Sequence, residues 1–145
     1  MKLAPTRIAA FLQRPDRETR AVLFYGPDEG LVRERSGILA RTVCPDLKDP
    51  FRVADLSAAT IAADPARLAD EAAQLSLTGG RRVVRVRGAG DGLAKLFGEF
   101  LKTAPGDALV VVEAGDLAPR SATNEKSALT GWLRLLRRFS PQRRG

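Results

Sequence analysis

The chain has 145 residues, of which 44% are hydrophobic, and its formal net charge at neutral pH is +7. This length and apolar content suit one compact domain that buries a continuous core. The lack of histidine excludes serine triads and histidine-containing zinc sites, and the single cysteine, Cys44, excludes an internal disulfide. Because the sequence shows no signal peptide and no membrane-spanning run, we expect a cytoplasmic protein with no membrane partner.

The positive charge is concentrated at one end of the chain. Residues 1–119 carry 17 basic and 16 acidic side chains, a net of +1, whereas residues 120–145 carry seven basic and one acidic, a net of +6. Basicity confined to a terminal stretch favours an appendage over a nucleic-acid-binding core. A basic nucleic-acid-binding module is therefore kept as an alternative, not as the leading interpretation.

The first third of the chain predicts a helix, a strand and a second helix. Residues 5–14 place apolar side chains at helical spacing, which indicates a short amphipathic helix. Residues 21–25 form a continuous apolar run, typical of a central parallel strand. Asp28 can cap the next helix, which is expected to continue to about Val43.

The middle of the chain predicts a strand, a helix and another strand. Residues 51–56 alternate as a half-exposed strand does. Asp64 and Pro65 suit the N-cap and first position of a helix, on which Leu75 shares the apolar face. Residues 81–87 indicate a strand, and its four arginines are expected at the strand ends or on a solvated edge rather than on phosphate.

The last predicted pair is a helix over residues 92–103, with one apolar stripe, and a buried strand over residues 108–112. Strand and helix thus alternate four times at intervals of about thirty residues, which is typical of βαβ units. The sequence therefore predicts an α/β fold with a parallel sheet flanked by helices.

The turn after the first buried strand has the layout of a phosphate-binding loop without its chemistry. Its residues are Gly26, Pro27, Asp28, Glu29 and Gly30. A P-loop continues with a second glycine, a lysine and a hydroxyl residue, but this chain has Leu31, Val32 and Arg33 at those positions. The two carboxylates of the turn would also repel a nucleotide's phosphates.

The end of the last buried strand also lacks a group that an ATP site needs. P-loop ATPases hold magnesium and water with an acidic pair at this place. Here Val112 replaces the first acid and only Glu113 remains. We therefore expect no catalytic residue, no cofactor and no metal. Two alternatives stay open: a turn built only for turn and cap chemistry, and a small NTPase with a degenerate site.

Three segments resemble the N-terminal domain of the delta subunit of bacterial DNA polymerase III, a subunit of the sliding-clamp loader. They are residues 23–31, 75–84 and 109–117, and the resemblance covers residues 1–121. It implies an AAA+-type, RecA-like fold that has lost ATP binding. It also implies that the protein is a non-catalytic accessory subunit that opens the sliding clamp, the beta subunit, together with the other loader subunits, and that it meets DNA only indirectly.

The resemblance also implies a site that contacts the clamp. In that family a helix ends in a Ser-Leu-Phe tip that enters an apolar pocket on the clamp. Ser76 and Leu77 match this tip, whereas Thr78 occupies the aromatic position, and Leu75 precedes it. These four residues are the predicted partner-binding site. The alternative is that Leu77 ends a helix on the protein's own core.

After Ser121 the resemblance ends, so the sheet is expected to be incomplete at its C-terminal end. Residues 122–145 are expected to form a basic tail outside the core. A truncated or frame-shifted product would explain the abrupt change in charge. A genuine short helix is the alternative, because apolar residues keep helical spacing there, namely Leu129, Trp132, Leu133, Leu136 and Phe139.

Overall fold

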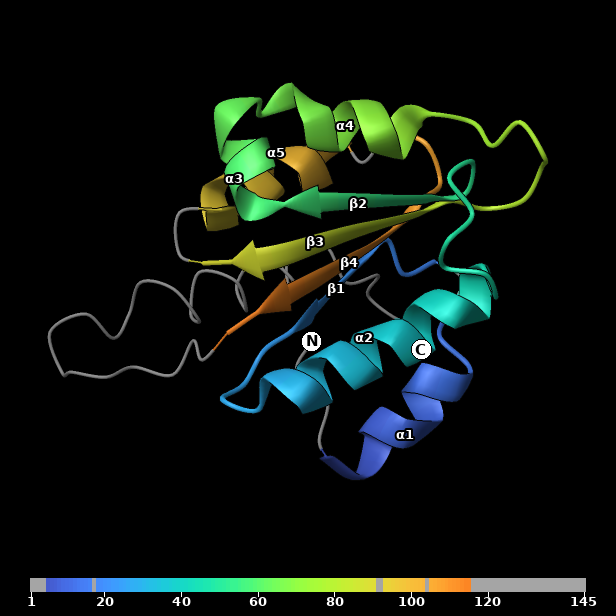
Figure 1. Cartoon of the computed structure of the whole chain (residues 1–145), viewed down its shortest axis with the longest axis vertical. Coiled ribbons are helices and arrows are strands. Elements are labelled where there is room, and N and C mark those ends of the chain that lie inside the picture. The colour runs from blue at the N-terminus through green and yellow to red at the C-terminus, as the bar shows by residue number, and fades with distance from the viewer. Residues whose placement is uncertain (1–4, 17, 91–92, 104, 116–145) are drawn as a thin grey trace, which may run out of the picture.

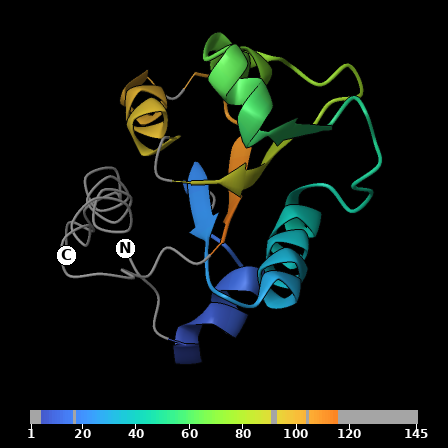
Figure 2. The same ribbon diagram turned by 60° about the vertical axis from the view of Figure 1, so that its left-hand side comes forward.

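The computed structural model describes residues 5–16, 18–90, 93–103 and 105–115 of the chain. In this part a parallel sheet lies between two layers of helices (Figures 1 and 2). The helices are α1 (Pro5–Gln13), α2 (Glu29–Val43), α3 (Ala58–Ala63), α4 (Ala66–Ala73) and α5 (Ala94–Thr103), and the strands are β1 (Ala21–Phe24), β2 (Val53–Ser57), β3 (Val83–Ala89) and β4 (Leu109–Ala114). The predicted tail, residues 122–145, lies outside the described residues.

The sheet has the strand order β1-β4-β3-β2, and each neighbouring pair is parallel. Val112 of β4 lies opposite Leu23 of β1 on one side and Val86 of β3 on the other. This confirms the predicted α/β fold with a parallel sheet flanked by helices. Among the described residues β1 is paired on one side only, and all four of its residues are only partly buried.

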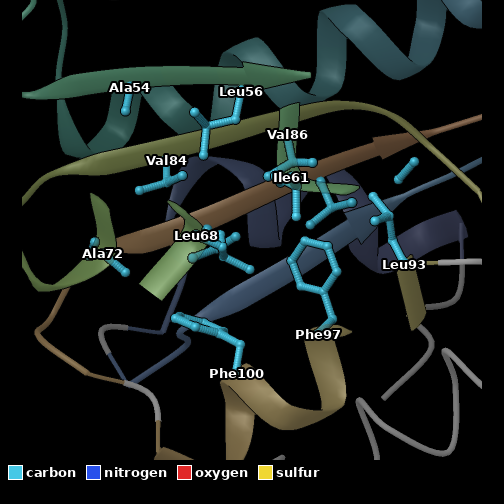
Figure 3. Packing of buried hydrophobic residues seen from close by; sticks show 14 of the residues in the cluster. Ala54, Leu56, Ile61, Leu68, Ala72, Val84, Val86, Leu93, Phe97 and Phe100 are labelled. Atoms are coloured by element: carbon cyan, nitrogen blue, oxygen red, sulfur yellow. The ribbon is translucent and has the colours of Figure 1, made fainter. Parts of the chain in front are cut away.

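Alternate residues of each strand face opposite layers, because successive side chains of a strand point to opposite faces. Val84 and Val86 belong to the cluster under α3, α4 and α5, whereas Val83 belongs to the cluster under α1 and α2. Figure 3 shows Phe97 and Phe100 of α5 pointing into the first cluster. The valine-rich strands are therefore buried on both faces, as expected for the centre of a parallel sheet.

The segment between β2 and β3 differs from its prediction. Ser57 caps a helix that the sequence did not predict, α3, by accepting a hydrogen bond from the amide of Thr60 at 3.1 Å. The amide of Asp64 bonds Thr60 O at the end of α3, so Asp64 also closes this helix. Pro65 takes the N-cap position of α4 without a side-chain bond. Pro65 nevertheless has helical dihedral angles, and the carbonyl of Asp64 accepts from the amide of Arg67 at 3.0 Å. The predicted backbone positions of Asp64 and Pro65 are thus confirmed, whereas no side-chain cap bond forms there.

The arginines around β3 also differ from their prediction, because β3 is an internal strand. Arg82 and Arg85 are 4% and 7% exposed, whereas Arg87 is exposed. Each buried guanidinium has a carboxylate partner, Glu71 for Arg82 and Glu113 for Arg85. Arg81 and Arg82 lie at the end of the strand, as predicted, although Arg82 is buried, and Arg87 is exposed, as predicted. The prediction fails for Arg85, which is buried inside the strand and therefore needs its partner.

Candidate functional site

The two sites predicted from the sequence lie at opposite edges of the sheet. The turn 25–28 follows β1, and the loop 74–82 precedes β3. Because all four strands run parallel, the turn lies at the carboxyl edge and the loop at the amino edge. No residue can serve both sites, and each site is described separately.

At the carboxyl edge, Asp28 is the N-cap of α2. Its Oδ1 accepts a hydrogen bond from the amide of Leu31 at 3.0 Å. The amide of Gly26 donates to Gly115 O at 3.2 Å, which joins the turn to the end of β4. In a phosphate site the first amides of the helix point at the ligand. Here the amide of Leu31 is already bonded to the carboxylate of Asp28, so a negative charge of the protein occupies the place of a bound phosphate.

Glu113 of β4 lies in a buried charge cluster. Its Oε1 accepts a hydrogen bond from Arg85 Nη2 of β3 at 3.3 Å, and it is also bonded to Ser36 Oγ of α2. The side chains of Arg85 and Glu113 are 8% and 12% exposed. The remaining acid of the predicted pair is therefore neutralised by an arginine inside the protein.

Sequence reasoning missed both partners of Glu113. Arg85 was expected on a solvated edge, and Ser36 had no predicted role. One signal was present in the sequence: Arg85 stands between Val84 and Val86, in the interior of an apolar strand. Such a position requires a buried partner of opposite charge if the strand is internal.

At the amino edge, the tip formed by Leu75, Ser76, Leu77 and Thr78 extends from the body of the protein. Figure 1 shows the loop between α4 and β3 leaving the layer of helices. Leu75 and Leu77 are each 85% exposed, the highest exposures among the large apolar side chains described. Helix α4 ends at Ala73, so Leu75 lies beyond the helical face on which it was predicted. The alternative that Leu77 packs on the core is wrong.

Hydrogen bonds inside the tip fix its shape. The amide of Gly79 donates to Ser76 O at 3.2 Å, which closes a turn with Leu77 at its apex. The amide of Thr78 donates to Ser76 Oγ at 3.3 Å, and the two hydroxyl oxygens lie 3.1 Å apart. Ser76 and Thr78 therefore form their hydrogen bonds within the tip, and the side chains of Leu75 and Leu77 remain exposed.

Arg82 fixes the base of the loop. Its Nη2 lies 3.2 Å from Glu71 Oε2, its Nη1 donates to Glu71 O, and its Nε donates to Phe51 O at 3.2 Å. A single buried guanidinium thus joins the last turn of α4 to the turn before β2. This contact explains why a loop with two exposed leucines can keep a defined position.

Two more arginines lie beside this edge. Arg81 donates from Nε to Asp107 O at 2.6 Å and from Nη2 to Thr19 O at 2.7 Å. Burial, with a smaller contribution from the nearby charge of Arg20, lowers the pKa of Arg81, and Asp107 opposes the shift. Burial likewise lowers the pKa of Arg20, again opposed by Asp107. Arg20 donates to the carbonyls of Ala108 and Pro105, so both side chains hold carbonyls of the connections at the amino ends of the strands.

Within the described residues, no group of three or more cysteine, aspartate or glutamate side chains could hold a metal ion. The same part of the chain has no helix that is long and apolar enough to cross a membrane.

The sequence matches no model of a known protein family and no curated protein. Its fold, however, is similar to two solved structures. A protein related to the gamma subunit of DNA polymerase III from Thermotoga maritima is 18% identical, with a TM-score of 0.55, over 76% of this chain and 39% of that chain. The clamp-loader delta protein of Bacillus subtilis is 15% identical, with a TM-score of 0.62, over 93% of this chain and 40% of that chain.

The chain thus spans about two fifths of the length of each structure that it matches. At these identities the likeness is one of fold. It confirms the fold resemblance that the three sequence segments predicted, and the chain has the fold of a clamp-loader domain.

Proposed function

We propose that this chain is a non-catalytic domain of a bacterial clamp loader, and that it binds the sliding clamp through the tip formed by Leu75, Ser76, Leu77 and Thr78. The observation that carries the proposal is the tip itself: two leucines, each 85% exposed, stand on a closed turn at one edge of a clamp-loader fold. Highly exposed leucines on a hydrogen-bonded turn can enter a partner's apolar pocket without disturbing their own core.

The accessory role is supported by the carboxyl edge. Asp28 uses its carboxylate as a helix cap, and Glu113 is paired with Arg85. Glu113 is therefore occupied by an ion pair inside the protein and is not available to bind magnesium or to orient a water. The residues Val32 and Arg33 stand where a P-loop has its lysine and hydroxyl groups. Any ATP hydrolysis in the loader is therefore assigned to other subunits.

The first prediction concerns Leu77. Leu77→Ala should weaken binding to the sliding clamp at least roughly tenfold, as expected for removal of a central anchor. Its midpoint of thermal unfolding should not change measurably, because an exposed side chain contributes little to stability. Surface-immobilised clamp and a thermal melt of the same preparation measure both quantities.

Leu31→Ala is the matched control, since Leu31 is an exposed leucine of α2 at the opposite edge of the sheet. It should bind the clamp as the parent does. Thr78→Phe should tighten binding, because it adds an aromatic anchor to the tip. If Leu77→Ala bound the clamp as tightly as the parent chain, the tip would not be part of the interface.

The second prediction concerns nucleotide. Titration of the full chain with a fluorescent ATP analogue and Mg²⁺ should give no saturable signal. Val32 stands where a P-loop has its phosphate-binding lysine, and Asp28 places a negative charge at the helix N-terminus. Saturable binding in the micromolar range that is lost on changing Asp28 would instead support the NTPase interpretation.

A further inference from the structure

Phe51 is an exposed aromatic side chain beside the base of the tip. It lies in the turn before β2 and is 50% exposed. The large apolar side chains exposed in the described residues fall into two groups. Leu31 and Ile38 lie on α2, whereas Phe51, Leu75 and Leu77 belong to the two connections at the amino edge of the sheet.

The turn that carries Phe51 is fixed by Asp49. The Oδ1 of Asp49 accepts a hydrogen bond from the amide of Phe51 at 2.9 Å, and its carbonyl accepts from the amides of Arg52 and Val53. These bonds hold the backbone of Phe51 in a defined turn. An aromatic ring has only two side-chain torsions to fix, so its entropic cost at an interface is small.

The two connections are held against each other by side-chain hydrogen bonds. Arg82, at the end of the loop 74–82, donates to Phe51 O at 3.2 Å. Arg52 donates in return to Arg81 O at 3.2 Å, and its guanidinium lies against Gly80. Figure 1 shows both connections at the same end of β2 and β3. Phe51 and the base of the tip therefore keep a fixed relative position.

We infer that Phe51, Leu75 and Leu77 form one docking surface, the amino-edge surface, in which Phe51 is the aromatic anchor. Protein interfaces concentrate their binding energy in a few anchors, often aromatic, and the loop from Gln74 to Gly80 contains no aromatic residue. The occupant is a protein with an apolar pocket. Under the proposed function, on which this inference rests, that protein is the sliding clamp.

The chemistry of the loop favours a protein pocket over other partners. Residues 74–80 carry no charged side chain, whereas nucleic acids and anionic membranes are bound mainly through lysine and arginine.

The test compares the full-length parent chain with Phe51→Ala, Phe51→Tyr and Ile38→Ala on immobilised sliding clamp. Phe51→Ala should weaken binding at least roughly tenfold. Phe51→Tyr keeps the ring and should bind more tightly than Phe51→Ala. A thermal melt of Phe51→Ala that matches the melt of the parent separates loss of the anchor from a folding defect. Ile38→Ala removes an exposed apolar side chain of α2 that does not belong to the amino-edge surface, and it should leave binding unchanged.

Three results would overturn the inference, and they differ in what else they reject. Parent-like binding by Phe51→Ala, with weak binding by Leu77→Ala, rejects Phe51 as an anchor and leaves the proposed function standing. No binding by the parent chain rejects both. A parent dimer in sedimentation that Phe51→Ala converts to a monomer assigns the surface to contacts between copies of the chain.

Discussion

Glu113→Ala is expected to lower the free energy of unfolding by about 3–5 kcal/mol, the usual loss when one partner of a buried ion pair is removed. The reason is the environment of Arg85, whose side chain is 8% exposed and whose Nε has no hydrogen-bond partner within the structure described. Without Glu113 its charge would stay buried and uncompensated. Urea denaturation measures the loss when the parent and the variant show the same slope of unfolding free energy against urea concentration.

A second ion pair of the same sheet provides the control. Arg87 and Asp55 lie 3.5 Å apart on β3 and β2, but their side chains are 48% and 53% exposed. Asp55→Ala should cost less than about 1 kcal/mol, as exposed pairs do. The double variant Arg85→Met with Glu113→Leu should recover most of the loss, because it leaves no charge to compensate.

The stability of Glu113→Ala also tests whether Glu113 could serve as a magnesium ligand. A carboxylate that stabilises the core through Arg85 is not available as a magnesium ligand. If Glu113→Ala cost no more than Asp55→Ala, the pair would contribute little to folding. Glu113 would then be free for another role, and the NTPase interpretation would gain support.

The second large effect is expected at Gly106, in the turn between α5 and β4. Gly106 has φ of 72°, and a Cβ at this position would lie far inside contact distance of the backbone carbonyl of Ala72. Gly106→Ala therefore adds a steric clash with backbone to the strain of a left-handed conformation. We expect a loss of roughly 3 kcal/mol in the free energy of unfolding, measured by urea denaturation.

Gly79→Ala separates the two causes. Gly79 has φ of 80°, but a Cβ there would meet no atom within 4 Å. Its cost should be only the conformational strain, about 1–2 kcal/mol. Equal losses at both glycines would show that the end of α4 can move away from the turn. Because Ala72 lies in the last turn of α4, Gly106→Ala should also disturb the tip and weaken clamp binding.

The sequence predicted the carboxyl edge better than the amino edge. Asp28 was identified as a helix cap because capping depends on residues within one turn of each other. The tip was identified only through family resemblance, and its exposure could not be read from the sequence. Helix α4 ends at Ala73, two residues before Leu75, and no glycine or proline marks that end.

Apart from the short helix α3, the sequence by itself determined the order of strands and helices and the α/β class of the fold, because both follow from the local periodicity of apolar residues. Only the tertiary structure decided which charges are buried. Arg82, Arg85 and Arg87 have similar neighbours along the chain, yet the first two are buried against Glu71 and Glu113 and Arg87 is exposed. Strand order is set by contacts between residues far apart in sequence, which no local pattern records. The position of Phe51 beside the tip has the same origin, since Arg82 joins turns that are about thirty residues apart.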